Sequence, residues 1–399
     1  MKVVQISGAY IGAQKVIEDA IHNALQNRGH ESYIFHTYGE SRTPYVVKYE
    51  GKFGCYVRRA LWKLTNKKQI SAAFSTAKLI GKIKKISPDI VHIHTIHHGH
   101  VDYPMLYRFL AKKKIPTVHT VHDMWTFTGG CYHYTDIGCD GYKNGCINCP
   151  MTESSLDCSV KDVHRNFQRK KRLLKQLDKL CFVSVSDWVN QQVVNTHLNQ
   201  YPQYIVLNAL PGTEALSVAR EENHASNPFI ILGVAAGWTE KKGIFRFFEL
   251  AKLLGEKVEI ILVGEASQKI TEAAPPNITF LGRVSQRSEL QKLYASVDLH
   301  VSMSLEETFG MTFVEAALSG TRSMGFDSTA IPYTLKKVKG IILPPNDVSA
   351  VAEKILALGS DRSLCRLQQT EIAEIKELFS VDKMAKQYLD IYTERLNSL

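Results

Sequence analysis

The sequence predicts an α/β protein made of two doubly wound, Rossmann-like domains that face a cleft. Short apolar runs alternate with helix-patterned segments along the whole chain, which is typical of parallel strands joined by crossover helices. The 399 residues suffice for two full hydrophobic cores. Between the halves, residues 208–227 contain Pro211, Gly212 and little periodicity, which indicates a linker. Sheets of this kind bind ligands beyond the carboxyl ends of their strands, so we expect the cleft there.

The domain boundaries follow from the same pattern. We expect a first domain over residues 1–207, a linker over 208–227 and a second domain over 228–375. The chain has a helical pattern after Asp361, and its last segment, 376–399, is a candidate to pack back on the first domain.

The elements of both domains are predicted from short apolar runs and from helical spacing. Val16, Ile17, Ala20 and Ile21 recur at the spacing of an amphipathic helix that Gly29 ends. The expected strands of the first domain are 3–7, 32–36, 90–94, 117–121, 182–186 and 204–207. Those of the second domain are 229–234, 259–263, 278–281, 299–302, 322–326 and 341–343.

Composition and charge narrow the function classes. With 44% hydrophobic and 22% charged residues, the chain is not a disordered, fibrous or small disulfide-stapled protein. Residues 1–205 hold 28 basic and 15 acidic side chains and residues 206–399 hold 21 and 24, which suggests domains with different tasks. The longest apolar stretch, 229–236, is too short to span a bilayer, and the start MKVVQIS lacks a secretory pattern. We therefore expect a cytoplasmic protein.

Two carboxylates flank a glycine turn in the second half, in the segment Glu307-Thr-Phe-Gly-Met-Thr-Phe-Val-Glu315. A helix is expected to begin near Phe309 and Gly310, and its unpaired N–H groups form a place for a phosphate. Carboxylates accept bonds from vicinal hydroxyls, so the pair suits a sugar and a ribose. A plainer interpretation is that Glu306 and Glu307 complement the helix dipole and that Glu315 is solvated.

This segment resembles the Glu-x7-Glu motif of the retaining glycosyltransferases of the GT-B fold, in particular glycosyltransferase family 4. The resemblance implies that Glu307 contacts the donor sugar and Glu315 the nucleotide ribose. It also implies that the turn Thr308-Phe309-Gly310-Met311 presents backbone amides to the donor.

Two further loops of the second half resemble the same family. Gly233-Val-Ala-Ala-Gly-Trp-Thr-Glu-Lys-Lys-Gly243 resembles the loop that holds the donor pyrophosphate, which makes Lys242 the first candidate cation and Lys241 the second. Where the family often has an arginine, this chain has Trp238. The run Phe280-Leu-Gly-Arg-Val-Ser285 resembles the strand end beside the nucleobase and implies contacts from Arg283 and Val284. Without the resemblance, the lysines and Arg283 suit a solvated surface.

Histidines and a glycine loop mark the first half. His92 and His94 share one face of a strand, because side chains alternate along it, and we expect one of them to be a hydrogen-bonded core residue. The Thr120-Val-His122-Asp123 segment at the end of the next strand also resembles family 4, which implies that His122 contacts the donor sugar. Asp123 is then a neighbour of His122 or a base acting on the acceptor, and otherwise a helix cap.

The loop Ser7-Gly8-Ala9-Tyr10-Ile11-Gly12 joins the first strand to the first helix and is not a dinucleotide fingerprint. In the family, the corresponding loop lies between phosphate and acceptor, and Gly8 and Gly12 permit a close approach. A simple tight turn explains the glycines equally well. No Asp-x-Asp occurs in the sequence, so a metal-bridged diphosphate has no obvious ligands, and we expect no cofactor for catalysis.

Four cysteines fall within one loop. Cys131, Cys139, Cys146 and Cys149 match the ligand count of a structural zinc, although the spacing is only partly standard, and His133 could replace one thiol. Free thiols and a redox-active or disulfide state are the alternatives. The flanking segments, Trp125-Thr-Phe-Thr-Gly-Gly and Cys149-Pro150, resemble a family 4 subgroup involved in polysaccharide and colanic-acid-type synthesis.

One basic segment lies between Glu50 and Asp89, with ten Lys or Arg and no acid. Interleaved aromatic and aliphatic residues make it partly amphipathic, as for a helix on an anionic membrane surface. A solvated lysine-rich face is the alternative, and no nucleic-acid motif accompanies the charge.

Together these patterns and the resemblance predict a transferase that moves a sugar from a nucleotide-sugar donor to a saccharide or lipid-linked saccharide. The resemblance implies that the anomeric configuration is retained and that the reaction serves cell-surface polysaccharide synthesis. A noncatalytic binding protein of the same fold and a GT-B sugar-nucleotide epimerase are the alternatives.

Overall fold

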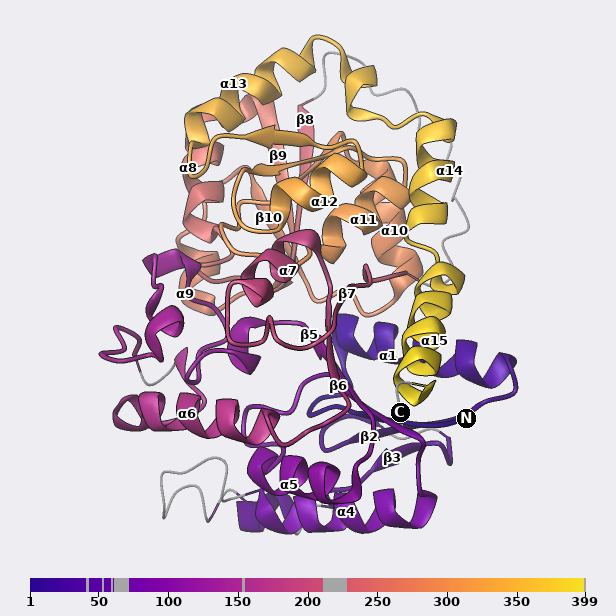
Figure 1. Cartoon of the computed structure of the whole chain (residues 1–399). Helices are drawn as coiled ribbons and strands as arrows, with labels where there is room; N and C mark the ends of the chain where they lie inside the picture. The colour runs from indigo at the N-terminus through magenta and orange to yellow at the C-terminus, as the bar shows by residue number, and fades with distance from the viewer. Residues whose placement is uncertain are drawn as a thin grey trace. The chain divides into compact units, whose positions relative to one another are not determined.

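The computed structural model describes residues 1–40, 43–51, 54–58, 60, 72–152, 155–210 and 228–397. The chain forms two units, one of Met1–Pro211 with Val381–Leu399 and one of Gly212–Ser380 (Figure 1). The predicted division was at 207 and 375, and most of the predicted linker, 211–227, lies outside the described residues.

Unit 1 is built on a seven-strand parallel sheet of order β3-β2-β1-β4-β5-β6-β7. Its strands are β1 (Lys2–Ile6), β2 (Glu31–His36), β3 (Val46–Lys48), β4 (Ile90–Ile93), β5 (Thr117–Val121), β6 (Leu180–Ser184) and β7 (Gln203–Ile205). Its helices are α1 (Gly12–Asn27), α4 (Ala73–Ile86), α5 (Tyr103–Lys113), α6 (Val163–Leu174), α7 (Asp187–Val194) and α15 (Val381–Asn397). Short 3₁₀ turns are η1 (Met124–Thr126), η2 (Thr135–Ile137), η3 (Gly141–Asn144) and η5 (Val160–Asp162).

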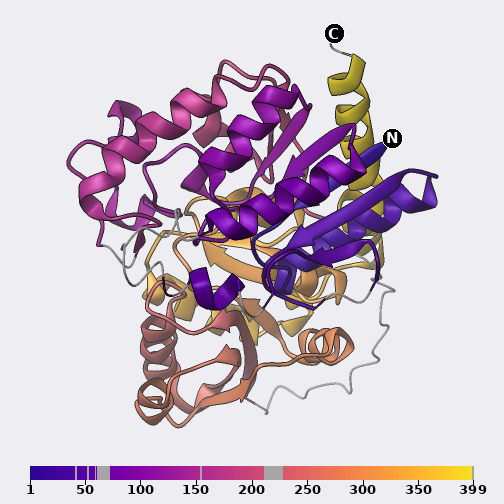
Figure 2. The ribbon, with the colours of Figure 1, turned by 90° about the horizontal axis from the view of Figure 1, so that it is seen from below.

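The last helix, α15, belongs to the core of unit 1. Met384, Tyr388, Ile391 and Tyr392 recur at helical spacing and are buried, because this stripe packs against the apolar face of α1 and the strands beneath it. Figure 2 shows this C-terminal helix beside the first elements of the chain. The apolar stripe therefore explains why a segment from the far end of the sequence completes this core.

Unit 2 is built on a six-strand parallel sheet of order β10-β9-β8-β11-β12-β13. Its strands are β8 (Phe229–Gly237), β9 (Val258–Glu265), β10 (Ile278–Gly282), β11 (Leu299–Val301), β12 (Ser323–Phe326) and β13 (Ile341–Leu343). Its helices are α8 (Ile244–Leu254), α9 (Gln268–Glu272), α10 (Arg287–Ser296), α11 (Met311–Leu318), α12 (Ile331–Lys337), α13 (Val348–Gly359) and α14 (Gln369–Leu378), with 3₁₀ turns η6 (Gly255–Lys257) and η7 (Arg362–Cys365).

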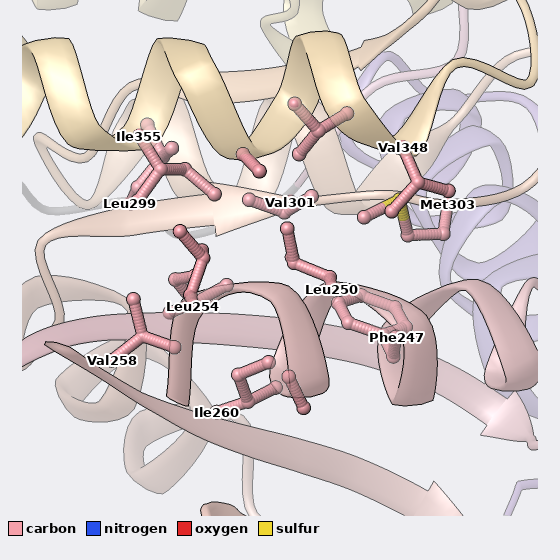
Figure 3. Packing of buried hydrophobic residues seen from close by; sticks show 14 of the residues in the cluster. Phe247, Leu250, Leu254, Val258, Ile260, Leu299, Val301, Met303, Val348 and Ile355 are labelled. Carbon is pink, nitrogen blue, oxygen red and sulfur yellow. The ribbon is translucent and has the colours of Figure 1, made fainter. Parts of the chain in front are cut away.

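The main core of unit 2 lies between its sheet and the helices α8 and α13. Phe247, Leu250 and Leu254 of α8 meet Leu299 and Val301 of the central strand β11 (Figure 3). All these side chains are nearly inaccessible to solvent, and burial of each contributes roughly 1.5–3 kcal/mol before the entropy cost of ordering it. This packing holds the ends of the strands, and so the loops that follow them, in fixed places.

Both sheets are doubly wound, as predicted. The strand order reverses between β1 and β4 in unit 1 and between β8 and β11 in unit 2. Loops that leave the carboxyl ends of such neighbouring strands diverge and make the usual ligand position of this fold. Strand β3 is an element that the sequence analysis missed.

Candidate functional site

The loop after β8 and the loop after β11 meet at the switch point of unit 2. Gly243 has φ +80° and precedes α8, and a Cβ built on it would lie 2.2 Å from the carbonyl oxygen of Met303. Only glycine fits such a conformation and such an approach. The glycine therefore brings the lysines before it next to the turn after β11.

Lys242 and Glu307 form the centre of this edge. The Lys242 Nζ lies 2.5 Å from the Glu307 Oε1, and both side chains are half-buried. The Glu307 backbone is fixed as well, because its N–H donates to the Thr329 Oγ1 at 3.0 Å and its carbonyl accepts from the Ala330 N–H at 3.2 Å. A cation and a carboxylate are thus held at the place where this fold binds anionic ligands. Lys241 is exposed beside them.

The turn Thr308–Met311 shapes the start of α11. Gly310 has φ +86° and is the N-terminal cap residue, so the helix begins at Met311 as the sequence predicts. Phe309 is buried, and its carbonyl accepts a hydrogen bond from the Thr334 hydroxyl. The first N–H groups of α11 have no partner within the helix, which gives this end a partial positive charge.

Glu315 lies on the second turn of α11 in a less polar setting than Glu307. Burial raises the pKa of its carboxyl above the ordinary range, while a hydrogen bond from the Tyr294 hydroxyl at 3.1 Å and the charge of Arg287 oppose the rise. Tyr294 and Arg287 both come from α10, and no sequence motif pointed to them.

The remaining predicted residues of unit 2 have other surroundings. Trp238 is a core residue that packs edge-on against Phe247, with the ring centres 5.5 Å apart, so an apolar ring stands where the resembled motif suggested an arginine. Arg283 is exposed and Val284 packs on the core, both after the edge strand β10. Within the described residues, no hydrogen bond or ion pair joins Arg283 to Lys242, Glu307 or Glu315.

Arg246 is a cation that the sequence analysis missed. It lies one turn into α8, and its Nη1 donates to the Met303 carbonyl at 3.3 Å while its Nε donates to the Asn346 Oδ1 at 2.5 Å. The signal in the sequence was the proximity of Arg246 to Gly243, because a cation in the first turn of the helix lies close to the glycine turn that carries Lys242.

His122 and Asp123 follow β5 at the carboxyl edge of the unit 1 sheet. The His122 Nε2 lies 3.0 Å from the His94 Nδ1, which comes from the end of the neighbouring strand β4. Burial lowers the pKa of His122 to about 4, so the imidazole is neutral at pH 7. The sequence analysis placed His94 and His122 on consecutive strands, and the pairing of β4 with β5 brings them together.

Asp123 is held by two partners. Its Oδ1 accepts from the Trp125 N–H at 2.9 Å, which caps η1, and its Oδ2 lies 2.6 Å from the His97 Nε2. Burial alone would raise the pKa of Asp123, but the charge and hydrogen bond of His97 outweigh burial and hold this pKa well below its usual range. A carboxylate with so low a pKa is a weak base, so these contacts favour the capping and ion-pair role over the acceptor-base role.

Gly8 and Gly12 serve the first loop differently. A Cβ on Gly8 would lie 2.6 Å from the His100 ring, whose Nδ1 lies 2.6 Å from the Thr37 Oγ1. Gly12 has φ +58° and open space around it, at the start of α1. The first glycine is therefore needed for packing, while the second leaves room above the helix start.

The four cysteines of the loop after η1 line one small cavity of about 20 Å³. Burial raises the pKa of Cys131 to about 12 and that of Cys146 to about 11, so both thiols are protonated at neutral pH. Cys139 and Cys149 are half-buried. Among the described residues, no three His, Cys, Asp or Glu side chains are placed to hold a metal ion, and the zinc site stays a prediction.

A fifth thiol and a buried lysine accompany this cavity. Cys158 donates to the Gly129 carbonyl at 3.5 Å, and the Cys146 Sγ accepts from the N–H of the same glycine at 3.1 Å. Lys170 is almost fully buried, and its Nζ lies 4.0 Å from the centre of the Trp125 ring. Burial lowers the pKa of Lys170 to about 8. Sequence spacing had not connected Cys158 or Lys170 with the loop.

The predicted basic segment is described only in part. Residues 52, 53, 59 and 61–71 lie outside the described residues. The described part includes α4, which neighbours α5, which in turn neighbours α6 (Figure 1). These three helices contain no Asp or Glu and carry eleven exposed or half-buried Lys or Arg: Lys78, Lys82, Lys84, Lys85, Arg108, Lys112, Lys113, Arg165, Arg169, Lys171 and Arg172. No described helix is long and apolar enough to cross a bilayer.

Comparisons with known proteins agree with this architecture. Residues 12–150 match the model of Glycosyltransferase Family 4, and residues 228–361 match that of Glycosyl transferases group 1. WcaC of Escherichia coli (strain K12), named as a colanic acid biosynthesis glycosyl transferase, is 22% identical over 411 residues, which cover 96% of each chain.

Solved structures show the same fold. Sucrose-phosphate synthase from Thermosynechococcus elongatus has a TM-score of 0.68 at 16% identity and covers 99% of this chain and 98% of its own. HepE of Anabaena in complex with UDP-glucose has a TM-score of 0.63 at 14% identity and covers 100% of both chains. With its two parallel-sheet units and its two matched domains, the chain belongs to the family 4 glycosyltransferases of the GT-B fold.

Proposed function

We propose that this glycosyltransferase moves a sugar from a nucleotide-sugar donor to a saccharide or lipid-linked saccharide acceptor, with retention of the anomeric configuration, in cell-surface polysaccharide synthesis. The observation that carries the proposal is the Lys242–Glu307 pair at the switch point of unit 2, 2.5 Å apart. A diphosphate sugar contains both an anion for the lysine and hydroxyls for the carboxylate.

The residues of unit 2 would each bind a different part of the donor. Lys242, supported by Lys241, neutralises the diphosphate as negative charge develops on the leaving group. Glu307 is then released from its ion pair and accepts bonds from the sugar hydroxyls. Glu315, further along α11, accepts bonds from the ribose, and Arg283 and Val284 lie at the strand end assigned to the base. The resemblance to the retaining motif supports retention, in which the departing phosphate takes up the acceptor proton.

The residues of unit 1 would contact the donor sugar and bind the acceptor. His122 contacts a sugar hydroxyl, and the loop of Gly8 and Gly12 gives the substrate a close approach. The similarity to WcaC, named for colanic acid biosynthesis, and to HepE, solved with UDP-glucose, supports a polysaccharide product and a nucleotide-sugar donor.

A panel of nucleotide sugars tests the donor. A ligand that binds the native state raises its melting temperature, so the true donor should produce the largest shift, and its nucleoside diphosphate a smaller one. That donor is then incubated with candidate acceptors. Nucleoside diphosphate release that requires acceptor supports the proposal. Binding without release indicates a noncatalytic binding protein, and conversion of the donor without acceptor indicates an epimerase.

We further propose that the protein is cytoplasmic and binds the inner face of the membrane as a peripheral protein. The support is the layer formed by α4, α5 and α6, whose exposed charges are all positive. Each cation near an anionic surface is worth about 1 kcal/mol, so a few of them suffice for reversible binding. A membrane-bound position would bring the enzyme to a lipid-linked acceptor.

Vesicle flotation tests this surface. The protein should float with vesicles that contain phosphatidylglycerol and not with phosphatidylcholine alone, and salt should release it. The double variant Lys112→Glu and Lys113→Glu should bind less, whereas the matched variant Lys336→Glu and Lys337→Glu on α12 should bind as the wild type does. Equal absence from both vesicle types would leave a solvated face as the explanation.

A further inference from the structure

A chain of hydrogen bonds runs from the core of unit 1 to His122. The His122 Nε2 lies 3.0 Å from the His94 Nδ1, and the His94 Nε2 lies 3.0 Å from the Gln5 Oε1. Gln5 and His94 are almost completely buried, whereas His122 is half-buried at the sheet edge. Each ring nitrogen in such a chain must either donate or accept, so the end of the chain fixes its whole polarity.

The orientation of the Gln5 amide sets that end. Its Nε2 donates to the backbone carbonyl of Glu18 at 3.3 Å, which turns the Oε1 toward His94. A reversed amide would place two acceptors against each other. An amide oxygen only accepts, so the hydrogen between Gln5 and His94 lies on the His94 Nε2.

His94 transmits this polarity to His122. Burial lowers the pKa of His94 well below its usual range, so the ring is neutral and carries one N–H. Because that N–H is on Nε2, the His94 Nδ1 is an acceptor, and the hydrogen in the next bond belongs to the His122 Nε2.

The second ring nitrogen of His122, Nδ1, then carries a lone pair and no hydrogen. His122 is also neutral at pH 7, with a pKa of about 4, so Nδ1 carries no hydrogen. Among the described residues, this atom is neither hydrogen-bonded nor one of the buried polar atoms without a partner, so it reaches solvent. An exposed imidazole lone pair accepts from a hydroxyl and repels a carbonyl or carboxylate oxygen.

We propose that Gln5 and His94 are positioning residues that hold His122 in the Nε2–H tautomer, so that its Nδ1 accepts a hydrogen bond from a sugar hydroxyl. The inference about the ligand rests on the proposed function, and the inference about the tautomer does not. The site would thereby select a sugar with a hydroxyl at the contacted carbon over its deoxy or keto analogue.

Nitrogen NMR of the protein labelled with ¹⁵N-histidine tests the tautomer directly, because protonated and unprotonated ring nitrogens have widely separated shifts. The signals of His122 are assigned by their loss in the variant His122→Asn. At pH 7.5 the wild type should show a protonated Nε2 and an unprotonated Nδ1 for both His122 and His94. A protonated Nδ1 on His122 would overturn the proposal, and this result needs no substrate and no further variant.

The variant Gln5→Met removes the acceptor that fixes the chain. Its His94 signals should become those of a mixture of tautomers, and kcat/KM for transfer should fall about tenfold, the effect of one lost hydrogen bond. Thr120→Val is the matched control, because Thr120 is equally buried and its hydroxyl bonds to His92 and Tyr388, which are not part of the hydrogen-bonded series from Gln5 to His122. It should lose a comparable amount of thermal stability but keep the His122 tautomer and most of the activity. Equal loss of activity in both variants, with unchanged tautomers in Gln5→Met, would reduce Gln5 to a structural role and refute the proposal.

Ligand titrations identify the source of the hydroxyl. The nucleotide sugar selected by the thermal-shift panel should move the Nδ1 signal of His122, whereas its nucleoside diphosphate should not. A shift caused only by the acceptor saccharide assigns the hydroxyl to the acceptor. If no nucleotide sugar binds while the Nε2–H tautomer is observed, the proposed function fails and the tautomer assignment stands.

Discussion

The two units present their functional loops in chemically different ways. Unit 2 gathers charged groups, Lys242 and Glu307, on turns that glycines shape. Unit 1 gathers neutral histidines, the buried His92 and His94 and the half-buried His122, that bond to one another or to hydroxyls and amides. The difference teaches that one fold can place an ion pair at the strand ends of one sheet and a chain of neutral, hydrogen-bonded side chains at the strand ends of another. The two designs should also fail under different perturbations.

The largest effect is expected at Glu307. Glu307→Ala removes the carboxylate that we propose contacts the donor sugar, and we expect transfer to fall by at least about 100-fold, as when one transition-state contact is lost. Folding should survive, because the side chain is half-buried and pairs only with Lys242 among the described contacts. Initial rates and melting temperature measure both effects.

The exposed Glu289→Ala on α10 is the control and should retain activity. Unchanged turnover of Glu307→Ala with the correct donor would refute the role of Glu307 and with it the assigned donor site.

Substitution of a turn glycine should destabilise unit 2 more than unit 1. Gly243→Ala places a methyl group 2.2 Å from the Met303 carbonyl at φ +80°, and we expect a loss of roughly 2–4 kcal/mol in the unfolding free energy. Gly12→Ala also has positive φ but meets open space, so it should cost about 1 kcal/mol. Urea unfolding of the two variants measures the difference, and equal costs would show that the close contact at Gly243 relaxes.

Acid should weaken unit 1 before unit 2. Burial lowers the pKa of nine described histidines of unit 1 but of only one described histidine of unit 2, His300. The nine are His22, His30, His36, His92, His94, His100, His119, His122 and His197. Below the unfolded pKa of about 6.5, the unfolded chain binds more protons than the folded one, so stability falls as pH falls. A fully buried one of these histidines costs up to about 2 kcal/mol at pH 5.

Two groups of unit 1 behave differently. Burial raises the pKa of Glu18 to about 8, so its contribution to stability grows as pH falls from 8 toward 4.5. This gain offsets the loss of stability caused by about one of the histidines. Burial would lower the pKa of His97, but the charge and hydrogen bond of Asp123 outweigh burial and raise this pKa, so the contribution of protonated His97 to stability is lost as pH rises through the raised value. The contribution of Asp123, whose pKa is lowered, is lost only below the ordinary carboxyl pKa of 3.8, outside the range between pH 7.5 and pH 5. Hydrogen exchange at pH 7.5 and pH 5 should show β4 and β5 losing protection before β8 and β11. The reverse order would contradict the assigned neutral state of the histidines.

The smallest effect concerns the cysteine loop. Elemental analysis of purified protein should find about one zinc per chain if the four predicted thiols bind metal, and a chelator should then lower the melting temperature. Without metal, the half-buried Cys139 and Cys149 should react with a thiol reagent faster than the buried Cys131 and Cys146. Absence of zinc, with four titratable thiols in the native protein, would rule out the metal site.

Much of the fold follows from local sequence, and part of the site does not. The alternation of apolar runs and helical stripes predicted twelve of the strands, and the motif around Glu307 and Glu315 predicted the turn at Gly310. Strand β3 was missed because three residues with one buried side chain leave too short a pattern.

Contacts across long sequence separations could not be predicted either. The His92 Nδ1 lies 2.7 Å from the Tyr392 hydroxyl, 300 residues away, and Gln5 reaches His94 only because β1 and β4 pair in register. Likewise, Arg287 and Tyr294 reach Glu315 through the packing of α10 on α11. Such partners are set by tertiary packing, which local patterns do not encode.

The proposed transfer reaction can be observed in a single experiment. The wild-type protein is incubated with the nucleotide sugar that stabilises it most and with a saccharide acceptor, and the product is analysed by mass spectrometry and proton NMR. We expect a new glycosidic bond with the anomeric configuration of the donor, formed together with one nucleoside diphosphate and lost in Glu307→Ala. Nucleoside diphosphate release at the same rate without acceptor, or a product of inverted configuration, would contradict this expectation.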